Sequence, residues 1–341
     1  KAPDWRDSQA LNPEKKPAWL TPTVNGLANE LMPRVNSAAA INGMALTALC
    51  LLASKTQTMS KTELAQAMRD YLALFELAPY SANATLPKDD ADALLDHTLS
   101  LKRLQVSEDN YGTLISPLPD NAVFLTYYRN NIIHLFALPG LVMTAIFAHG
   151  KLEKNNILQL IAALYPLLQR ELFLHLSQDE ALAYTAQLID AFKQTGMLQQ
   201  KGRYLALPEA DSEQFHSSWL LSRCMQETLQ RYAVVLTILK RDKSISRNAL
   251  ERESKTVAER LSKLYGMHSP EFYDKNVLSS FISALRDNHW LDAGEDGSLK
   301  YSEEASALRK DIMALVWPEI VQHLQQDILQ ADREAGADEK V

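Results

Sequence analysis

A pattern that recurs three times constrains the fold of this chain more than any other feature of its sequence. Each copy contains an apolar helical segment, a short polar break, an amphipathic helical segment, a further helical segment and two strand-like runs around a turn. The copies follow one another at a spacing of roughly 93 residues, and such self-similarity indicates one structural unit used repeatedly. The sequence therefore predicts three units of the same architecture.

Local signals mark the helices of each copy. The apolar helices that open the copies are predicted at Ala45 to Ala53, Leu141 to Ala148 and Tyr232 to Lys240. Ser60 and Glu63, three positions apart, predict a capping box at the start of the helix that runs to Leu77. Residues 177–180 form a second such box, and Ser246 is predicted to cap the helix that runs to residue 265.

Each copy is predicted to end in a small hairpin, with its turn at residues 107–110, 201–202 or 294–297. Helices followed by a small hairpin are the outline of a winged-helix module. Glycine is scarce, at 11 residues, and Leu, Ala, Gln, Glu and Lys dominate the periodic segments, which favours helix. The predicted fold class is mainly α, with three tandem winged-helix-like modules made of helices plus small β-hairpins.

A chain of 341 residues exceeds the size at which one core stops growing, so several domains are expected. The predicted divisions are an opening segment and linker helix (1–36), a first helical module (37–120), a second module with the apolar helix (121–212), a third module (213–308), and a C-terminal helix with a disordered tail (309–341). The start of the chain is polar, carries no signal peptide and does not begin with Met. These features suggest a fragment of a longer protein.

The amino-acid composition limits which kinds of protein this chain can be. Hydrophobic residues make up 46% and charged residues 23%, which is typical of a soluble globular protein with a full core. The formal net charge of −7 opposes broad nucleic-acid binding, because polyphosphate is repelled unless cations are segregated into a patch. Cys50 and Cys224 lie far apart within helical patterns, so buried thiols are expected rather than a disulfide.

The segment from Thr126 to His134 combines two tyrosines, an arginine and two asparagines, and leads directly into the apolar run Leu135 to Ala148. This run is shorter than the roughly 20 residues that a membrane-spanning helix needs, and it contains Pro139 and Gly140, where a break is predicted. Two interpretations remain open. The run is either a buried core helix or an interfacial or re-entrant membrane element.

A winged-helix outline also raises a DNA-binding hypothesis. The candidate recognition helices oppose it in the first two copies, because they carry Glu63, Asp70 and Glu76, and Asp179, Glu180 and Asp190. Only the third copy has an excess of cations, with Lys240, Arg241, Lys243, Arg247, Arg252, Lys255, Arg260 and Lys263 against Asp242, Glu251, Glu253 and Glu259. This segment is either a docking surface for an anionic partner or a solvated face with pairs such as Glu251–Lys255 and Glu259–Lys263.

No catalytic, cofactor-binding or metal-ligating residue is predicted. The chain has no Gly-x-Ser-x-Gly elbow, no phosphate-binding glycine loop and no dinucleotide fingerprint. His175 with Asp179 and His323 with Asp327 have the spacing of one helical turn, although Ser177 is expected to cap a helix between the first two. The five tryptophans are interpreted as packing anchors.

Several runs resemble the carboxyl-terminal part of the bacterial membrane-bound glycerol-3-phosphate acyltransferases. They are Pro3 to Arg6, Pro17 to Asn25, Tyr127 to Ile132, Glu227 to Ala233, Ser254 to Ser262 and Pro270 to Lys275. In that family an acyl group passes from acyl carrier protein or acyl-coenzyme A to glycerol 3-phosphate, and the base is a His with an Asp five positions later. None of the eight histidines here has that partner, so no catalytic or substrate-binding residue is carried over.

The resemblance implies an accessory region that follows the acyltransferase domain and is inactive alone. The implied partners are the upstream acyltransferase domain, an acidic acyl carrier protein docked on the basic helix, and an anionic membrane surface, but not nucleic acid. The implied location is the cytoplasmic side of the inner membrane, as a peripheral protein. The alternative is a free-standing winged-helix array that binds nucleic acid or a protein.

Overall fold

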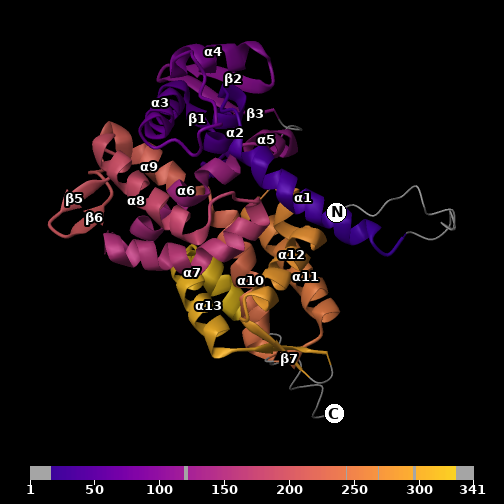
Figure 1. The fold of residues 1–341 in the computed structure, drawn as a ribbon. Coiled ribbons are helices and arrows are strands. Elements are labelled where there is room, and N and C mark those ends of the chain that lie inside the picture. Colours follow the sequence, from indigo (N-terminus) through magenta and orange to yellow (C-terminus); the bar gives the residue numbers. More distant parts are fainter. Residues whose placement is uncertain (1–16, 119–121, 243, 268, 295–296, 328–341) are drawn as a thin grey trace.

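The computed structural model describes residues 17–118, 122–242, 244–267, 269–294 and 297–327, and these are mainly helical (Figure 1). The helices are α1 (Leu20–Ser37), α2 (Gly43–Ala53), α3 (Lys61–Leu77), α4 (Ala91–Ser100), α5 (Ala122–Asn130), α6 (Ile133–His149), α7 (Lys154–Leu172), α8 (Gln178–Gln194), α9 (Glu213–Arg223), α10 (Gln226–Asp242), α11 (Arg247–Tyr265), the 3-10 helix η2 (Pro270–Tyr273), α12 (Lys275–Asp287) and α13 (Glu303–Leu315). The strands are β1 (Met59–Ser60), β2 (Leu104–Asp109), β3 (Gly112–Pro117), β4 (Lys151–Glu153), β5 (Gln199–Lys201), β6 (Tyr204–Ala206), β7 (Ser244–Ile245), β8 (Leu291–Ala293) and β9 (Leu299–Tyr301).

One order of elements occurs three times along the chain. A helix, a short strand, two helices and two strands follow one another in α2–β3, in α6–β6 and in α10–β9, the last with η2 inserted. The first strand pairs antiparallel with the last in each unit, giving sheet orders β1-β3-β2, β4-β6-β5 and β7-β9-β8. The predicted hairpins are thus confirmed as parts of three-stranded sheets. The additional strands were not predicted, because two or three residues carry no readable alternation.

The capping signals were read correctly from the sequence. Ser60 and Glu63 form both bonds of a capping box, as do Ser177 and Glu180, and the Ser246 side chain accepts from the backbone N–H of residue 249. Two turn positions were wrong by one or more residues. β2 continues to Asp109, and the chain turns at residues 110–111; in the second unit the turn is at residues 202–203. Residues 295–296 of the third predicted turn lie outside the described residues.

The apolar run forms the central helix of the molecule. α6 is buried from His134 to Ile146 and is not interrupted at Pro139, contrary to the prediction. Pro139 removes only one backbone donor from the helix. Gly140 has a different role, because its missing side chain lets α9 approach closely: a Cβ there would lie 3.3 Å from the Leu221 carbonyl oxygen. The break occurs earlier, at residues 131–132, where α5 and α6 meet at 89°.

No described helix is by itself long and apolar enough to cross a bilayer, and only the bent α5–α6 pair passes when its two parts are counted together. One hydrophobic core runs through all three units. The second unit lies at its centre, because its α8 packs against α3 of the first unit and its α7 packs against α12 of the third (Figure 1). Close packing also occurs within the first unit, where a Cβ on Gly43 would lie 2.7 Å from the Leu94 carbonyl oxygen.

Helix α1 is the exception to this packing. It projects from the body of the molecule (Figure 1), and none of its residues is buried. Asn36, near its end, anchors it by donating from Nδ2 to the carbonyl oxygens of Leu172 (2.8 Å) and Phe173 (3.3 Å). The Ser37 carbonyl oxygen also accepts from Ser81 Oγ, and Asn29, Met32 and Pro33 face the units, whereas the opposite side of the helix is exposed.

Candidate functional site

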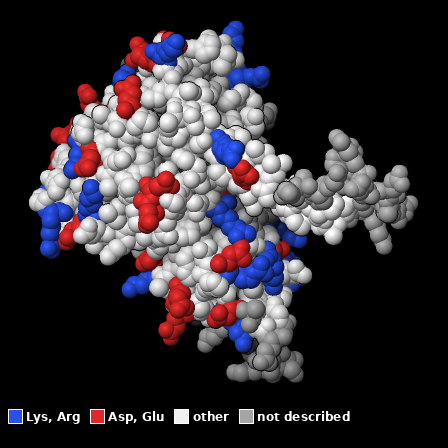
Figure 2. All heavy atoms as spheres, in the orientation of Figure 1, with Lys and Arg blue, Asp and Glu red and all other residues white. Residues whose placement is uncertain are grey.

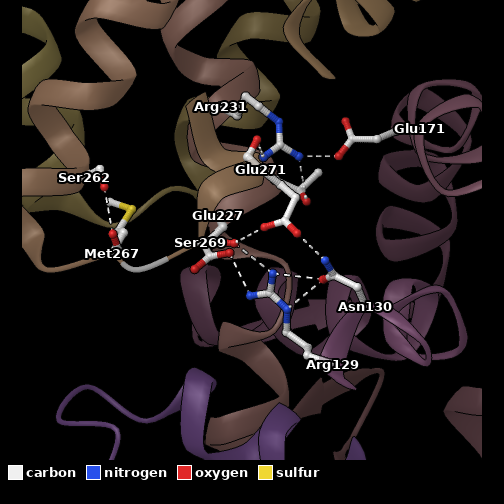
Figure 3. Close-up of polar contacts among 10 residues, drawn as sticks. Arg129, Asn130, Glu171, Glu227, Arg231, Ser262, Met267, Ser269 and Glu271 are labelled. Carbon is white, nitrogen blue, oxygen red and sulfur yellow. Dashed lines mark hydrogen bonds and ion pairs between the residues drawn. The ribbon is translucent and has the colours of Figure 1, made fainter. Parts of the chain in front are cut away.

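Arg129, at the end of α5, is almost fully buried and is the centre of a polar cluster (Figure 3). Its Nη1 donates to Glu227 Oε2 at 2.8 Å, and its Nη2 donates to Ser269 Oγ at 3.0 Å. Nε and Nη2 also reach Asn130 Oδ1, at 3.2 and 3.1 Å. The arginine and the first asparagine of the unusual 126–134 segment therefore act together, inside the protein.

The cluster continues through Glu271. Asn130 Nδ2 donates to Glu271 Oε1 at 2.5 Å, and Ser269 Oγ donates to Glu271 Oε2 at 2.9 Å. Glu271 thereby links the end of α5 to η2, which precedes α12. Its carbonyl oxygen also lies 3.4 Å from Arg231 Nη1.

A second ion pair joins Arg231 of α10 to Glu171 of α7, with both side chains at least nine-tenths buried. Arg231 stands one helical turn after Glu227, so a single face of α10 presents a carboxylate to Arg129 and a guanidinium to Glu171 (Figure 3). Within the described residues, Glu171 Oε2 and Arg231 Nε make no hydrogen bond. The cluster thus connects α5, the second unit and the third unit.

The charges in this cluster are held by one another. Burial alone raises the pKa of Glu227, but the Arg129 charge, the Arg129 hydrogen bond and the Ser269 hydroxyl outweigh it and hold that pKa below its ordinary value. Burial alone lowers the pKa of Arg231, and Glu171 more than reverses this. Glu227 and Arg231 therefore remain charged at neutral pH.

Two cavities flank the cluster, and Arg129 and Glu227 line both. The larger, of about 360 Å³, lies against the end of α2 and against Tyr265, Met267 and Trp317. The smaller, of about 240 Å³, lies against Asn36, His134 and Arg231. Arg129 and Arg231 are each already paired with a carboxylate. The cluster is therefore suited to a structural role, in which it holds the units together.

None of the described histidines forms an acid–base pair with these groups. His134 is buried, its Nε2 lies 3.0 Å from the Asn36 carbonyl oxygen, and burial lowers its pKa to about 4. His175 packs edge-on against Tyr80, and burial lowers its pKa too. Its predicted neighbour Asp179 lies beyond the Ser177 cap, whereas the predicted pair His323 and Asp327 approaches to 4.0 Å. Among the described residues, no three His, Cys, Asp or Glu side chains are grouped to hold a metal ion.

Cys50 and Cys224 are free thiols, as expected, with Cys50 buried and Cys224 half-buried. Burial raises the pKa of Cys224 to about 12, so it is not a reactive thiolate at neutral pH. Trp219 and Trp317 hold the Arg223 guanidinium between their rings, at 4.7 and 4.1 Å from the ring centres. Sequence reasoning missed this clamp, although Trp219 and Arg223 stand one helical turn apart.

The basic segment of the third unit is largely neutralised. Arg241 pairs with Asp242 and Glu253, Arg247 with Glu251, Lys255 with Glu259 and Arg260 with Asp327. The predicted pairs Glu251–Lys255 and Glu259–Lys263 do not form, because Glu251 is buried against Arg247. Figure 2 shows cations gathered over α11 and α12 with carboxylates among them. Lys243 lies outside the described residues.

Comparison with known proteins gives a consistent result. Residues 1–294 match the family model described as glycerol-3-phosphate acyltransferase C-terminal region. The chain is 67% identical over 323 residues to a glycerol-3-phosphate acyltransferase of Alteromonas mediterranea, and 52% identical over 324 residues to one of Pseudoalteromonas atlantica. Each match covers 95% of this chain but 40% of the relative. The chain thus spans well under half the length of these relatives.

Proposed function

Because the chain belongs to the glycerol-3-phosphate acyltransferases, as their carboxyl-terminal region, we propose that it is the non-catalytic part of an enzyme that transfers a fatty acyl group from acyl carrier protein or acyl-coenzyme A to glycerol 3-phosphate. That transfer is the first step of phospholipid biosynthesis. The chain contributes the support for an upstream acyltransferase domain. Its sequence lacks the family's paired His and Asp, which supports this division of labour.

The chain by itself is expected to show no acyl transfer, whereas the intact enzyme transfers the acyl group at a measurable rate. The reason is that a hydroxyl nucleophile needs a positioned base, and this chain has no histidine at the family spacing. Incubating each protein with labelled glycerol 3-phosphate and acyl-coenzyme A, then extracting the lipid, measures the difference. Labelled lipid formed by the purified chain, above the rate of a heat-treated sample, would contradict the proposal.

We further propose that each of the three units is a winged-helix module, with the boundaries predicted from the sequence. The shared order of helices and strands supports this. The modules are proposed to bind protein rather than nucleic acid, since α12, the third helix of its unit, packs against α7. The alternative of a free-standing nucleic-acid-binding array is disfavoured by the same packing and by the net charge of −7.

The main observation in favour of this supporting role is an exposed apolar stripe on α1. Leu20, Val24, Leu27, Leu31 and Val35 recur every three or four residues and so share one face. Leu20 is half-buried, and the other four are between 45% and 63% exposed. Most of the stability of a helix in a protein comes from packing of its apolar face, and Gly26 and Pro33 weaken this one further. The stripe is therefore proposed to pack against the upstream acyltransferase domain.

The charge of α1 favours a protein over an anionic membrane as the occupant. Glu30 and Arg34 are its only charged residues, and they pair with each other at 2.5 Å. Helices that lie on anionic lipid are usually rich in Lys and Arg on the polar face. This helix has none of that excess, so protein packing is the better match.

Replacing Leu27 and Leu31 together by glutamine tests the stripe, because glutamine retains helix propensity while removing apolar surface. Each buried leucine contributes about 1.5–3 kcal/mol, so amide-exchange protection of α1 in the intact enzyme is expected to fall at least tenfold. Hydrogen exchange read by mass spectrometry measures it. Asn25→Gln with Asn29→Gln, on the opposite face, is the matched control and should leave protection unchanged. Unprotected α1 amides in the unmodified intact enzyme would show that the stripe is not covered.

Two further partners are proposed. Lys240, Arg252 and Lys263 are exposed and have no carboxylate within 4.0 Å in the described part of the chain, which supports docking of an acidic acyl carrier protein on the third unit. Tyr127 and Phe147, on the bent α5–α6 pair, are exposed by 65% and 45%. Such side chains suit contact with an anionic membrane surface and thus peripheral placement on the cytoplasmic side of the inner membrane.

A further inference from the structure

The larger cavity beside the polar cluster contains a cation, Arg223, that forms no ion pair within the described residues, although the charge of Glu319 acts on it from the same cavity. Arg223 lies between Trp219 and Trp317, and its Nε donates to the Ala53 carbonyl oxygen at 2.5 Å. No Asp or Glu oxygen of the described chain comes within 4.0 Å of its guanidinium. The two rings and one carbonyl fix the orientation of the group while its Nη atoms make no hydrogen bond inside the described protein.

The other groups in the cavity give it a net positive character. Arg129 and Glu227 line it as a neutral pair, which leaves Arg223 and the exposed Lys55 against Glu319. An arginine held rigid by stacking is well suited to carboxylate or phosphate, because its donors form a planar fork that loses little freedom on binding. The cavity therefore favours an anionic group near Arg223.

The rest of the lining is apolar or neutral. Leu49, Leu52, Met267 and Trp317 supply an apolar wall, and Gln230, which is 1% exposed, has an Oε1 atom without a hydrogen-bond partner. A volume of about 360 Å³ exceeds what a bare inorganic anion needs and lies within the range of small-molecule sites. The occupant thus needs an apolar part as well as a charge.

We propose that this cavity binds a small anionic amphiphile, with its phosphate or carboxylate on Arg223 and Lys55 and its apolar part against Leu49, Leu52 and Trp317. The site draws on the first unit through the end of α2, on the third unit through Tyr265 and Met267, and on the segment after α13 through Trp317. Its occupant links these parts across the junction. Binding here is separate from the acyl transfer proposed above.

Octyl phosphate and octanoate are the probes, and tryptophan fluorescence is the readout, since two tryptophans contact Arg223. In the full 341-residue chain, at least one probe is expected to change the fluorescence saturably, with an affinity that falls as salt is added. The uncharged octanol and inorganic phosphate should each bind at least about tenfold more weakly, because charge-assisted hydrogen bonds and apolar burial each contribute that much. Tighter binding of octyl phosphate identifies the head group as phosphate, and tighter binding of octanoate identifies it as carboxylate.

Arg223→Gln is expected to weaken binding about tenfold or more. Because Arg223 also packs between two rings, Lys55→Gln provides a second variant at an exposed position, expected to weaken binding severalfold with an unchanged melting temperature. Lys88→Gln, an exposed cation of the same unit outside the cavity, is the control. The proposal is overturned if neither probe changes the fluorescence at millimolar concentration, if octanol or inorganic phosphate binds as tightly, or if Lys55→Gln and Lys88→Gln have equal effects.

Discussion

Arg231→Met is expected to lower the free energy of unfolding by about 3–5 kcal/mol, because it leaves the Glu171 carboxylate buried without its partner. The Glu171 side chain is 10% exposed, and its Oε2 already lacks a hydrogen bond. After the substitution this carboxylate faces only the smaller cavity, and no other cation of the described residues lies within 4.0 Å of it. Urea unfolding followed by circular dichroism measures the change, and the shared core of the three units supports a single cooperative transition.

Two further variants test whether the unpaired Glu171 carboxylate, and not the loss of any arginine, causes the destabilisation. Arg34→Met removes an exposed partner, since Arg34 and Glu30 are 72% and 61% exposed, and it should cost less than about 1 kcal/mol. Arg231→Met combined with Glu171→Met should recover most of the lost stability, because no charge is then left buried. If the double variant were no more stable than Arg231→Met, the unpaired carboxylate would not be the cause.

Phe136→Ala is expected to cost about 3–5 kcal/mol, because it opens a cavity where the first and second units meet. Phe136 of α6 is fully buried. Its ring packs edge-on against Tyr71 and Phe75 of α3, with ring centres 5.4 and 5.0 Å apart. These contacts join the first unit to the second, so the lost free energy should lower the stability of the whole cooperative unfolding transition.

Phe147→Ala on the same helix is the matched control, since Phe147 is 45% exposed and leaves no comparable cavity. It should change the free energy of unfolding by less than about 1 kcal/mol. Differential scanning calorimetry compares the two variants. A first unit that melts separately in the unmodified chain, with Phe136→Ala affecting only that step, would show that the units are independent.

The sequence was most informative for caps and turns, whose signals lie within one or two helical turns, although the Trp219–Arg223 contact was missed and the Glu251–Lys255 pair was wrong at the same range. The Ser60–Glu63 and Ser177–Glu180 boxes were predicted because both partners stand three residues apart. The threefold repeat, the mainly helical class and the three hairpins followed from local periodicity and turns in the same way. The break predicted at Pro139 was wrong, because burial of α6 on nearly every side outweighs one missing backbone donor.

The candidate site was only half visible in the sequence. The segment containing Arg129 was recognised as unusual, but the groups that satisfy Arg129 were not, since Glu227 stands 98 residues and Ser269 140 residues away. The pairing of Arg231 with Glu171, across 60 residues, has the same origin. No spacing rule links such positions, because the packing of the units brings them together.

What the amino-acid sequence determined by itself is the mainly helical class, the capping boxes, the repeated order of helices and hairpins and the family to which the chain belongs, whereas α5 and α9 were not predicted and α6 begins eight residues before the predicted start at Leu141. Tertiary structure alone decided that the three units share one core, that Arg129 is buried rather than presented to a partner, and that Arg223 is clamped beside a cavity. The physical reason is the separation along the chain over which each kind of interaction acts. Backbone hydrogen bonding and capping act between near neighbours in the chain, whereas burial and ion pairing depend on which distant surfaces come into contact.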